Sequence, residues 1–562
     1  MKSRHLLLMF VLSFVLLLSG QGLCLQDAPY SDAQLSVAMD MMLRNFTQEK
    51  DKGKKDHRNR TYLSGVIVAS PSFMGYPAWF SGCHNYERVW LRDAAIAMST
   101  LTDIYKTSKG QNPSLPAAPK LWGIEKFDAV PFFKSYITFA GETQKDIGVE
   151  GCDKADSQYA HAVFGVDGKQ DPWGAQTDGP ALRAISIMKI LDVATPAELG
   201  LKDEELYTRY QPCANMGILK RDLCYVTKSP DKVAYDLWEE VPDVFFFNSL
   251  AQYEALIRGL KVAGKYEDGS FVEEMKFAKD NLAKSLAAKF WRTDKCQGYY
   301  AHWSKTDSCP NKRNRSVYNN ENCINISTIL PFTLTDDTPI NIASENSLRN
   351  ADAVRKAFCY TSCDNGDRKP QARYEIDDGS NGFCMYLGRY PGDVFDGGDD
   401  TTSNPWVLST VSMAHFYYKL ARVITEQCAL SVTPDVLPFF SFILHVDSNR
   451  NPDKATFDAL QKVAASSTHG VSDRTLLKKL AESLALEGDA LIGAVKFYFP
   501  GPMDFDGKKT WLPEQINAKR EAPQHHMRSA QDLTWSYAAL LSAMLERKML
   551  EHALETYPAN CQ

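Results

Sequence analysis

Two glutamates in aromatic surroundings are the residues of this chain best suited to acid–base chemistry. Glu239 lies in Tyr235-Asp-Leu-Trp-Glu-Glu240, and Glu514 lies far downstream in Trp511-Leu-Pro-Glu-Gln515. An apolar ring beside a carboxyl disfavours the anion and raises its pKa, so one such group can donate a proton near neutral pH. A second carboxyl, when ionised, can take a proton from water. Hydrolysis of a glycosidic bond needs such a pair, so the two glutamates indicate carbohydrate chemistry.

Two further clusters combine aromatic rings with hydrogen-bonding groups. Trp90-Leu-Arg-Asp93 sets an indole beside Arg92 and Asp93, and Trp173 begins the segment Trp-Gly-Ala-Gln-Thr-Asp178. A sugar has apolar ring faces and polar rims, so aromatic side chains next to charged groups suit its recognition. Each motif alone also has an ordinary interpretation, because an Arg-Asp pair is often a surface ion pair and a tryptophan is often part of the core.

Seven blocks along the chain resemble those of the glucoamylases, glycoside hydrolase family 15, and stand in the order of that family. They are Trp90-Leu-Arg-Asp93, Asp178-Gly-Pro-Ala-Leu-Arg183, Tyr235-Asp-Leu-Trp-Glu-Glu240, Gly388-Arg-Tyr-Pro391, Asn404-Pro-Trp406, Glu514-Gln515 and Asp532-Leu-Thr-Trp-Ser-Tyr-Ala-Ala-Leu-Leu541. Any one block is a weak signal of this family, whereas seven blocks in the same order are a specific one. The resemblance covers most of the chain from about residue 35 onward and implies one catalytic domain over residues 35–556.

The resemblance implies how the glutamates divide the chemistry. Glu239, beside Trp238, matches the general acid of the family, and Glu514 matches the general base, with Tyr86 next to the attacking water. Glu240 matches an acid that touches the leaving-group sugar. Adjacent carboxylates cannot themselves be the acid–base pair, because they would not control a water on the opposite face of the sugar. Taken alone, Glu239 could equally be a carboxylate at a helix entry and Glu240 part of a solvated face.

The resemblance also implies which residues bind the substrate. Arg92 and Asp93 match a pair that holds the non-reducing glucose through its 4- and 6-hydroxyls, and Arg389 matches another polar clamp. Trp173 matches a tryptophan that flanks the acid, and Trp90 adds a ring beside the charged pair. Neither a cofactor nor a metal is expected.

Three departures from the family pattern and one histidine pair bear on these expectations. The loop from Trp173 to Asp178 is one residue shorter than usual and lacks the arginines of the family, so contacts to the second and third sugars should differ. Ile516 replaces an aromatic residue after Glu514-Gln515. An acidic, glycine-rich stretch over residues 393–400 fails the EF-hand spacing and is interpreted as a solvated loop. His525-His526 lacks zinc-ligand spacing and is interpreted as a surface pair.

Together these residues predict a secreted, exo-acting, inverting α-glucosidase. It would release β-D-glucose from non-reducing ends of α-1,4-glucans such as starch, glycogen and maltooligosaccharides, and cleave α-1,6 links more slowly. A trehalase or an isomaltose-type α-glucosidase on the same fold is the first alternative, because the loop at 173–178 is altered. A non-catalytic sugar-binding protein is the second. The presence of both Glu239 and Glu514 argues against it, since binding alone needs neither an acid nor a base.

The chain start and its composition favour an extracellular protein. Lys2 and Arg4 precede an apolar run over residues 6–18, so residues 1–24 are predicted to be a signal peptide. Without Cys24, 13 − 1 = 12 cysteines remain, an even number that allows complete pairing. Acceptor sequons begin at Asn45, Asn59, Asn314 and Asn325. A net charge of −6 gives no reason to expect nucleic acid, no further stretch suits a membrane, and a monomer is expected.

Helical periodicity dominates between the loops. Apolar stripes predict helices over residues 246–264, 275–286, 407–418 and 533–544. Neither a linker nor a repeat divides the 562 residues, so a single domain is expected. The resemblance implies its all-α architecture: an (α/α)6 toroid of six inner and six outer helices, with the pocket at its loop-rich end.

Overall fold

The computed structural model describes most of the chain. The described residues are 27–71, 86–117, 119–124, 127–148, 152, 157–209, 215–293, 298–304, 324–335, 339–359, 385–391, 393, 395, 404–446, 452–499, 512–517 and 527–560. The predicted signal peptide, the sequon at Asn314, His525-His526 and most of the acidic stretch after Asp393 lie outside them.

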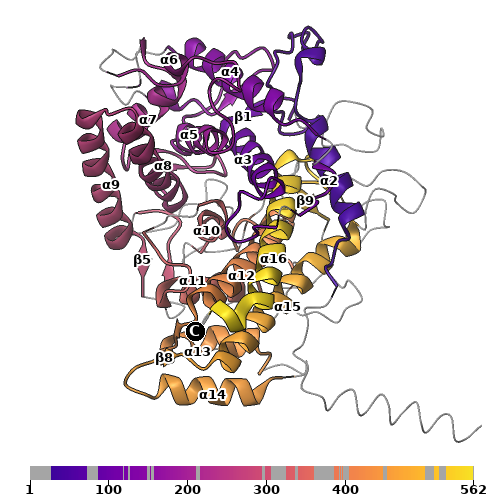
Figure 1. Ribbon diagram of the computed structural model, residues 1–562, viewed down its shortest axis with the longest axis vertical. Helices are drawn as coiled ribbons and strands as arrows, with labels where there is room; N and C mark the ends of the chain where they lie inside the picture. The colour runs from indigo at the N-terminus through magenta and orange to yellow at the C-terminus, as the bar shows by residue number, and fades with distance from the viewer. Residues whose placement is uncertain are drawn as a thin grey trace, which may run out of the picture.

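Within these residues, twelve helices alternate along the chain between an outer and an inner position. The outer helices are α2 (Asp32–Arg44), α4 (Val130–Asp146), α7 (Ile218–Lys228), α9 (Gly269–Lys289), α11 (Glu345–Cys359) and α15 (Arg474–Tyr498). The inner helices are α3 (Leu91–Ser108), α5 (Asp178–Leu191), α8 (Phe246–Lys265), α10 (Leu330–Leu334), α12 (Val407–Gln427) and α16 (Thr534–Asn560). Each inner helix contacts the next, and α16 returns to α3, so the ring closes (Figure 1). The predicted all-α toroid is confirmed.

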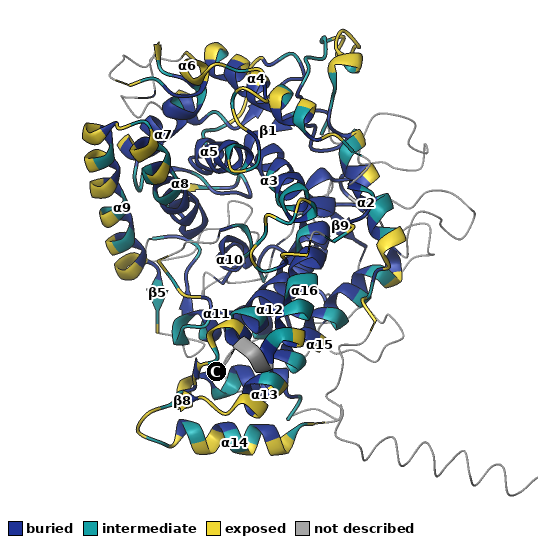
Figure 2. Cartoon of the chain, in the orientation of Figure 1, coloured by how far each residue is buried: buried dark blue, intermediate teal, exposed yellow. Residues whose placement is uncertain are grey.

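Burial explains the two positions. The inner helix α12 is buried without interruption from Val407 to Ala421, as expected for a helix surrounded by protein. The outer helix α9 buries one stripe and exposes the opposite face, where Phe277 is 71% exposed. Figure 2 shows this contrast between a dark inner ring and outer helices with exposed faces.

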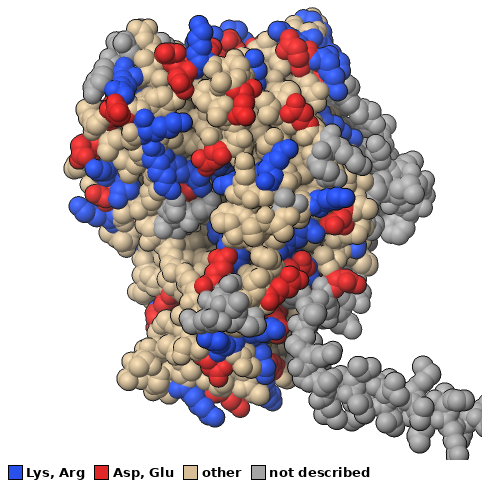
Figure 3. All heavy atoms as spheres, viewed as in Figure 1, with Lys and Arg blue, Asp and Glu red and all other residues tan. Residues whose placement is uncertain are grey.

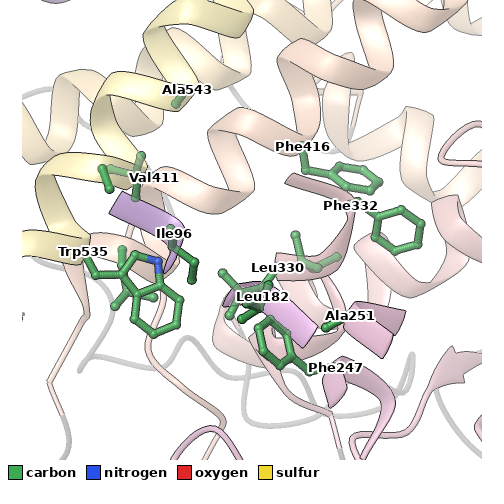
Figure 4. Close-up of a cluster of buried hydrophobic side chains, with 14 of the residues drawn as sticks. Ile96, Leu182, Phe247, Ala251, Leu330, Phe332, Val411, Phe416, Trp535 and Ala543 are labelled. Carbon is green, nitrogen blue, oxygen red and sulfur yellow. The ribbon is translucent and has the colours of Figure 1, made fainter. Parts of the chain in front are cut away.

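Side chains from all six inner helices meet in the centre of the ring. Figure 4 shows one or two from each: Ile96, Leu182, Phe247, Ala251, Leu330, Phe332, Val411, Phe416, Trp535 and Ala543. Burial of apolar area at about 25 cal/mol per Å² is the main favourable contribution here. Any helix of the ring therefore depends on its neighbours for the burial of its inward face.

Strands occur only as five two-residue antiparallel pairs in the described part of the chain. They are β1 (Val89–Trp90) with β2 (Val163–Phe164), β3 (Ala234–Tyr235) with β4 (Pro242–Asp243), β5 (Trp291–Arg292) with β6 (Tyr299–Tyr300), β7 (Leu430–Ser431) with β8 (Gly470–Val471), and β9 (Gln515–Ile516) with β10 (Met527–Arg528). The remaining α-helices lie outside the ring: α6 (Asp203–Leu206), α13 (Leu437–Ile443) and α14 (Lys454–Ala464).

The cysteines and sequons qualify the expectations for an extracellular chain. Cys152, Cys359 and Cys428 lie in disulfides, and Cys224 is buried in α7. Two sequons are internal as well. Asn45 donates to Thr534 Oγ1, and the buried Asn325 accepts a bond from Trp238. Among the sequons of the described residues, Asn59 alone is exposed.

The surface carries mixed charge. Figure 3 shows basic and acidic side chains intermingled over one face of the molecule. Among the helices that the structure describes, none has the length and apolar character needed to cross a membrane.

Candidate active site

A pocket of about 870 Å³ opens among the hairpins and inner-helix ends at one end of the ring. Its size falls within the range typical of small-ligand sites, about 300–1,000 Å³. The structure brings all ten sequence-predicted site residues to its walls: Tyr86, Trp90, Arg92, Asp93, Trp173, Trp238, Glu239, Glu240, Arg389 and Glu514.

The tight hairpin between β3 and β4 presents Glu239. Its turn spans residues 236–241, and Asp236 Oδ1 accepts the backbone N–H groups of Glu240 and Val241 at 2.7 and 3.1 Å. Burial opposes ionisation of Asp236, but bonds from His302 and from these N–H groups hold its pKa below its usual value. Glu239 itself has φ of 66°, in the left-handed region that few residues other than glycine adopt. Such backbone strain is concentrated at functional sites.

The Glu239 carboxyl contacts both an indole and a guanidinium. Trp90 Nε1 donates to its Oε1 at 2.6 Å, and Arg92 Nη2 lies 3.8 Å from the same oxygen. Desolvation outweighs both contacts and raises the pKa of Glu239 to about 7. A quarter of the side chain is nevertheless exposed, and it faces the pocket. The group is therefore a proton donor near neutral pH that a ligand can reach.

Glu514 is held by backbone pairing between distant segments. Its N–H donates to the carbonyl of Ala530 at 2.8 Å, and its carbonyl accepts the N–H of Val407, the first residue of α12, at 3.1 Å. Ile516, the departure from the family pattern, is fully buried in β9 and pairs with Met527 of β10. The aliphatic side chain thus fills an internal position beside the carboxylate segment.

Two hydroxyls contact the Glu514 carboxyl. Ser529 donates to Oε2, and the Tyr86 hydroxyl lies 3.2 and 3.3 Å from the two oxygens. Desolvation raises the pKa of Glu514 to about 7, while the bond from Ser529 and the charge of Arg389 oppose the rise. A general base must be ionised, whereas burial shifts both glutamates in the same direction. Desolvation therefore raises the pKa of both carboxyls toward neutral pH.

On one wall of the pocket, Arg92 joins several acids. Its guanidinium lies 3.5 Å from Asp93 and 3.2 Å from Asp178, and also bonds Gln176 at 3.2 Å. Arg92 and Asp93 are only 5% and 8% exposed. Desolvation raises the pKa of Asp93 to about 6, against the opposing charge of Arg92. This wall offers a fixed set of charged donors and acceptors for a polar ligand group.

Glu240 and Arg389 form a buried network on another wall. Arg389 Nη2 donates to Glu240 Oε1 at 2.9 Å, and Tyr390 donates to Glu240 Oε2 at 2.6 Å. Asp393 accepts two further bonds from Arg389, at 2.8 and 2.6 Å. Asp393 is fully buried, so the interpretation of this residue as part of a solvated loop is wrong. Asp393 is buried because the desolvated guanidinium of Arg389 bonds it as a second carboxylate, in addition to Glu240.

Three aromatic rings lead from Glu514 to the mouth of the pocket. Tyr86 and Trp90 have ring centroids 5.4 Å apart, and Trp90 meets Trp173 edge-on at 5.8 Å and 82°. Trp173 is 39% exposed, in contrast to the buried Arg92 and Asp93. The pocket therefore has a polar, buried floor and an aromatic, exposed rim.

Several lining residues were not predicted. Trp406 and Trp535 occur within matched blocks, so their position in those blocks was an available signal. Tyr235 likewise begins a matched block. Arg88 and Phe395 lie outside the blocks, and side-chain direction decides whether such residues reach the pocket. The sequence around Ser529 did not mark it as a site residue, because its contact with Glu514 depends on the pairing of β9 with β10.

A closed α/α ring with two reachable carboxyls of raised pKa in one sugar-sized pocket defines a glycoside hydrolase. The model of the family "Glycosyl hydrolases family 15" matches residues 37–545. The chain belongs to this family.

Individual relatives agree with the family match. A glucoamylase of Blastobotrys adeninivorans is 24% identical over 93% of this chain and 72% of its own. An intracellular, sporulation-specific glucoamylase of Saccharomyces cerevisiae is 26% identical over 87% of this chain and 80% of its own. The solved glucoamylase of Saccharomycopsis fibuligera shares the fold, with a TM-score of 0.68 at 22% identity over 92% of this chain and 95% of that one.

Proposed function

We propose that the protein is an exo-acting α-glucosidase of glucoamylase type. It removes glucose from the non-reducing ends of α-1,4-glucans such as starch, glycogen and maltooligosaccharides, and cleaves α-1,6 branches more slowly. The observation that carries the proposal is the presence of Glu239 and Glu514, each with its pKa raised to about 7, in one pocket. The buried Arg92 and Asp93 favour exo action, because Arg92 lies 3.8 Å from Glu239 and these charged groups can hold the hydroxyls of a terminal sugar beside the acid.

In the proposed reaction, Glu239 gives its proton to the glycosidic oxygen as the bond to the anomeric carbon breaks. Glu514 takes a proton from a water near Tyr86, and the oxygen of that water bonds to the anomeric carbon from the opposite face. Both protons are thereby accounted for, and no covalent intermediate forms. The active protonation state has Glu239 neutral and Glu514 ionised.

The stereochemistry of the product tests this proposal. Direct attack by water inverts the anomeric carbon, so an α-glucan should release β-glucose first. Proton NMR of the anomeric signals within the first minutes, before mutarotation, reads the outcome. Early α-glucose would overturn the role of Glu514 as base. Cleavage of trehalose with no cleavage of maltose would instead overturn the substrate assignment.

Ser529 should set the acid limb of the pH profile. The Ser529→Gly variant removes a donor to the Glu514 carboxylate, and glycine suits the φ of 60° at this position. Loss of that donor disfavours the anion and raises the pKa of Glu514 further. Because kcat/KM requires ionised Glu514, its acid limb should then move to higher pH, by about half a unit to one unit.

The matched control for this shift is Ser536→Ala. Ser536 is buried and donates to the carbonyl of Pro513 at 2.8 Å, so it supports the same segment without touching the carboxylate. Its acid limb should stay in place. An unchanged limb in Ser529→Gly, or equal shifts in both variants, would contradict the role of Ser529.

We also propose that the protein is secreted as a monomer after removal of residues 1–24, with residues 35–556 as its catalytic domain. The basic start and apolar run of the first residues support secretion. The disulfides at Cys152, Cys359 and Cys428 support it as well, since disulfides persist in oxidising compartments.

A further inference from the structure

Arg88 lies at the rim of the pocket beside Trp173. It lines the pocket, and its guanidinium carbon is 5.7 Å from the centroid of the Trp173 ring. The loop that begins at Trp173 carries no cation of its own as far as Asp178. The two residues thus combine a planar cationic donor with the exposed indole of the rim.

The position of Arg88 is fixed by its surroundings. The residue lies between Tyr86 and the strand β1, and its carbonyl accepts the N–H of Ala69 at 2.9 Å. Its Nε lies 3.1 Å from Asp171 Oδ2, which also accepts Arg60 Nη1 at 2.9 Å. The Arg88 side chain is only 11% exposed. Because the salt bridge and the packing already restrict this side chain, binding a ligand there would lose little rotamer freedom.

The order of groups along the pocket shows which part of a substrate would reach Arg88. Arg92 and Asp93 form the buried floor, and Trp90 contacts both Glu239 and Trp173. A sugar on the floor therefore has its scissile oxygen near Glu239, and the rest of the chain must leave past Trp173. The rim faces the leaving-group sugars, not the glucose that is released.

We infer that Arg88, together with Trp173, binds the sugar units on the leaving-group side of the scissile bond and so sets the preference for chain length. The inference rests on the proposed function. Guanidinium N–H groups can donate to the hydroxyl oxygens of a sugar, and the indole can cover an apolar face of its ring. Arg88 is thus a specificity residue from the β1 segment, on a wall where the loop after Trp173 supplies no cation.

Two substrates separate this role from a structural one. Maltotriose carries sugars into the leaving-group side, whereas α-glucosyl fluoride places only glucose in the pocket. Arg88→Ala should lower kcat/KM on maltotriose about tenfold or more, chiefly through KM, because a hydrogen bond from a charged donor is lost. On α-glucosyl fluoride the loss should be no more than about twofold. Equal losses on both substrates, no loss on maltotriose, or a loss on maltotriose carried by kcat rather than KM, as expected if only the acid were disturbed, would overturn the inference.

Arg58→Ala is the matched control. Arg58 lies 3.7 Å from the same Asp171, but its side chain is 42% exposed and does not line the pocket. It should behave as wild type on both substrates. Arg88→Lys guards against misfolding of the alanine variant: it keeps the charge but loses the planar fork, and should show a selective loss on maltotriose of intermediate size. If the wild-type protein cleaves α-glucosyl fluoride but not maltotriose, the proposed function itself fails and the inference falls with it.

Discussion

Glu239→Gln should lose at least about a thousandfold in kcat on maltose, with little change in binding. General acid catalysis contributes about 10²–10⁴-fold, and the sugar leaving group is poor. Glutamine keeps an oxygen to accept the bond from Trp90 and keeps the shape of the side chain, but has no proton to give. Steady-state assays give kcat, and calorimetry with maltotriose gives the affinity.

Glu267→Gln is a matched control for this variant. Glu267 also has a positive φ, 52°, but its side chain is 81% exposed and does not line the pocket. Its kcat should stay at the wild-type value, which would show that a Glu→Gln change in the left-handed region is harmless in itself. If Glu239→Gln hydrolysed maltose at an undiminished rate, another residue would have to be the acid.

Glu514→Gln should lose about 10²–10⁴-fold in kcat on maltose and on α-glucosyl fluoride alike, because water needs a base with either substrate. Glu239→Gln should differ: fluoride leaves without protonation, so that variant should retain much of its activity on α-glucosyl fluoride. Comparison of the two variants on the two substrates thus assigns each role separately. A Glu514→Gln variant that kept its activity on α-glucosyl fluoride would contradict the role of Glu514 as base.

The Glu514→Gln variant also tests the origin of the acid limb of the pH profile. Activity that requires ionised Glu514 falls as pH drops through its raised pKa. The residual activity of Glu514→Gln should therefore lack the acid limb, while the alkaline limb from Glu239 remains. Rates measured across the pH range on maltose show whether one limb disappears.

Much of the architecture was predictable because it is local or carried by motifs. The stripe over 246–264 matches α8, which ends at Lys265, and the stripe from 407 begins α12. The extents were harder to predict: α12 continues to Gln427 and α16 to Asn560. The apolar stripe identifies a core-facing helix, but an inner helix buried on every side has no contrasting polar face to mark where it ends.

The site was predictable as a set of residues, but not as a set of contacts. Glu240 and Arg389 were expected to contact a sugar, and in the structure they also bond each other, while Tyr390 donates to Glu240 and Asp393 accepts from Arg389. The left-handed backbone of Glu239 follows from a hairpin closed around Asp236. The first contact joins segments far apart in sequence, and the second detail depends on hydrogen bonds within one turn. Neither composition nor periodicity records such contacts.

Closure of the ring determines the order in which the parts of the site form during synthesis. The inner ring closes when α16 packs on α3, and the N–H of Thr534 then donates to the carbonyl of Ala69 at 2.8 Å. Glu514 depends on the same event, because its N–H bonds Ala530, immediately before that helix. During synthesis, therefore, Arg92, Asp93 and Glu239 are made long before the contacts that position Glu514 can form. Contacts over such separations form slowly, so under the proposed mechanism a chain that has not closed the ring should not hydrolyse a glycosidic bond.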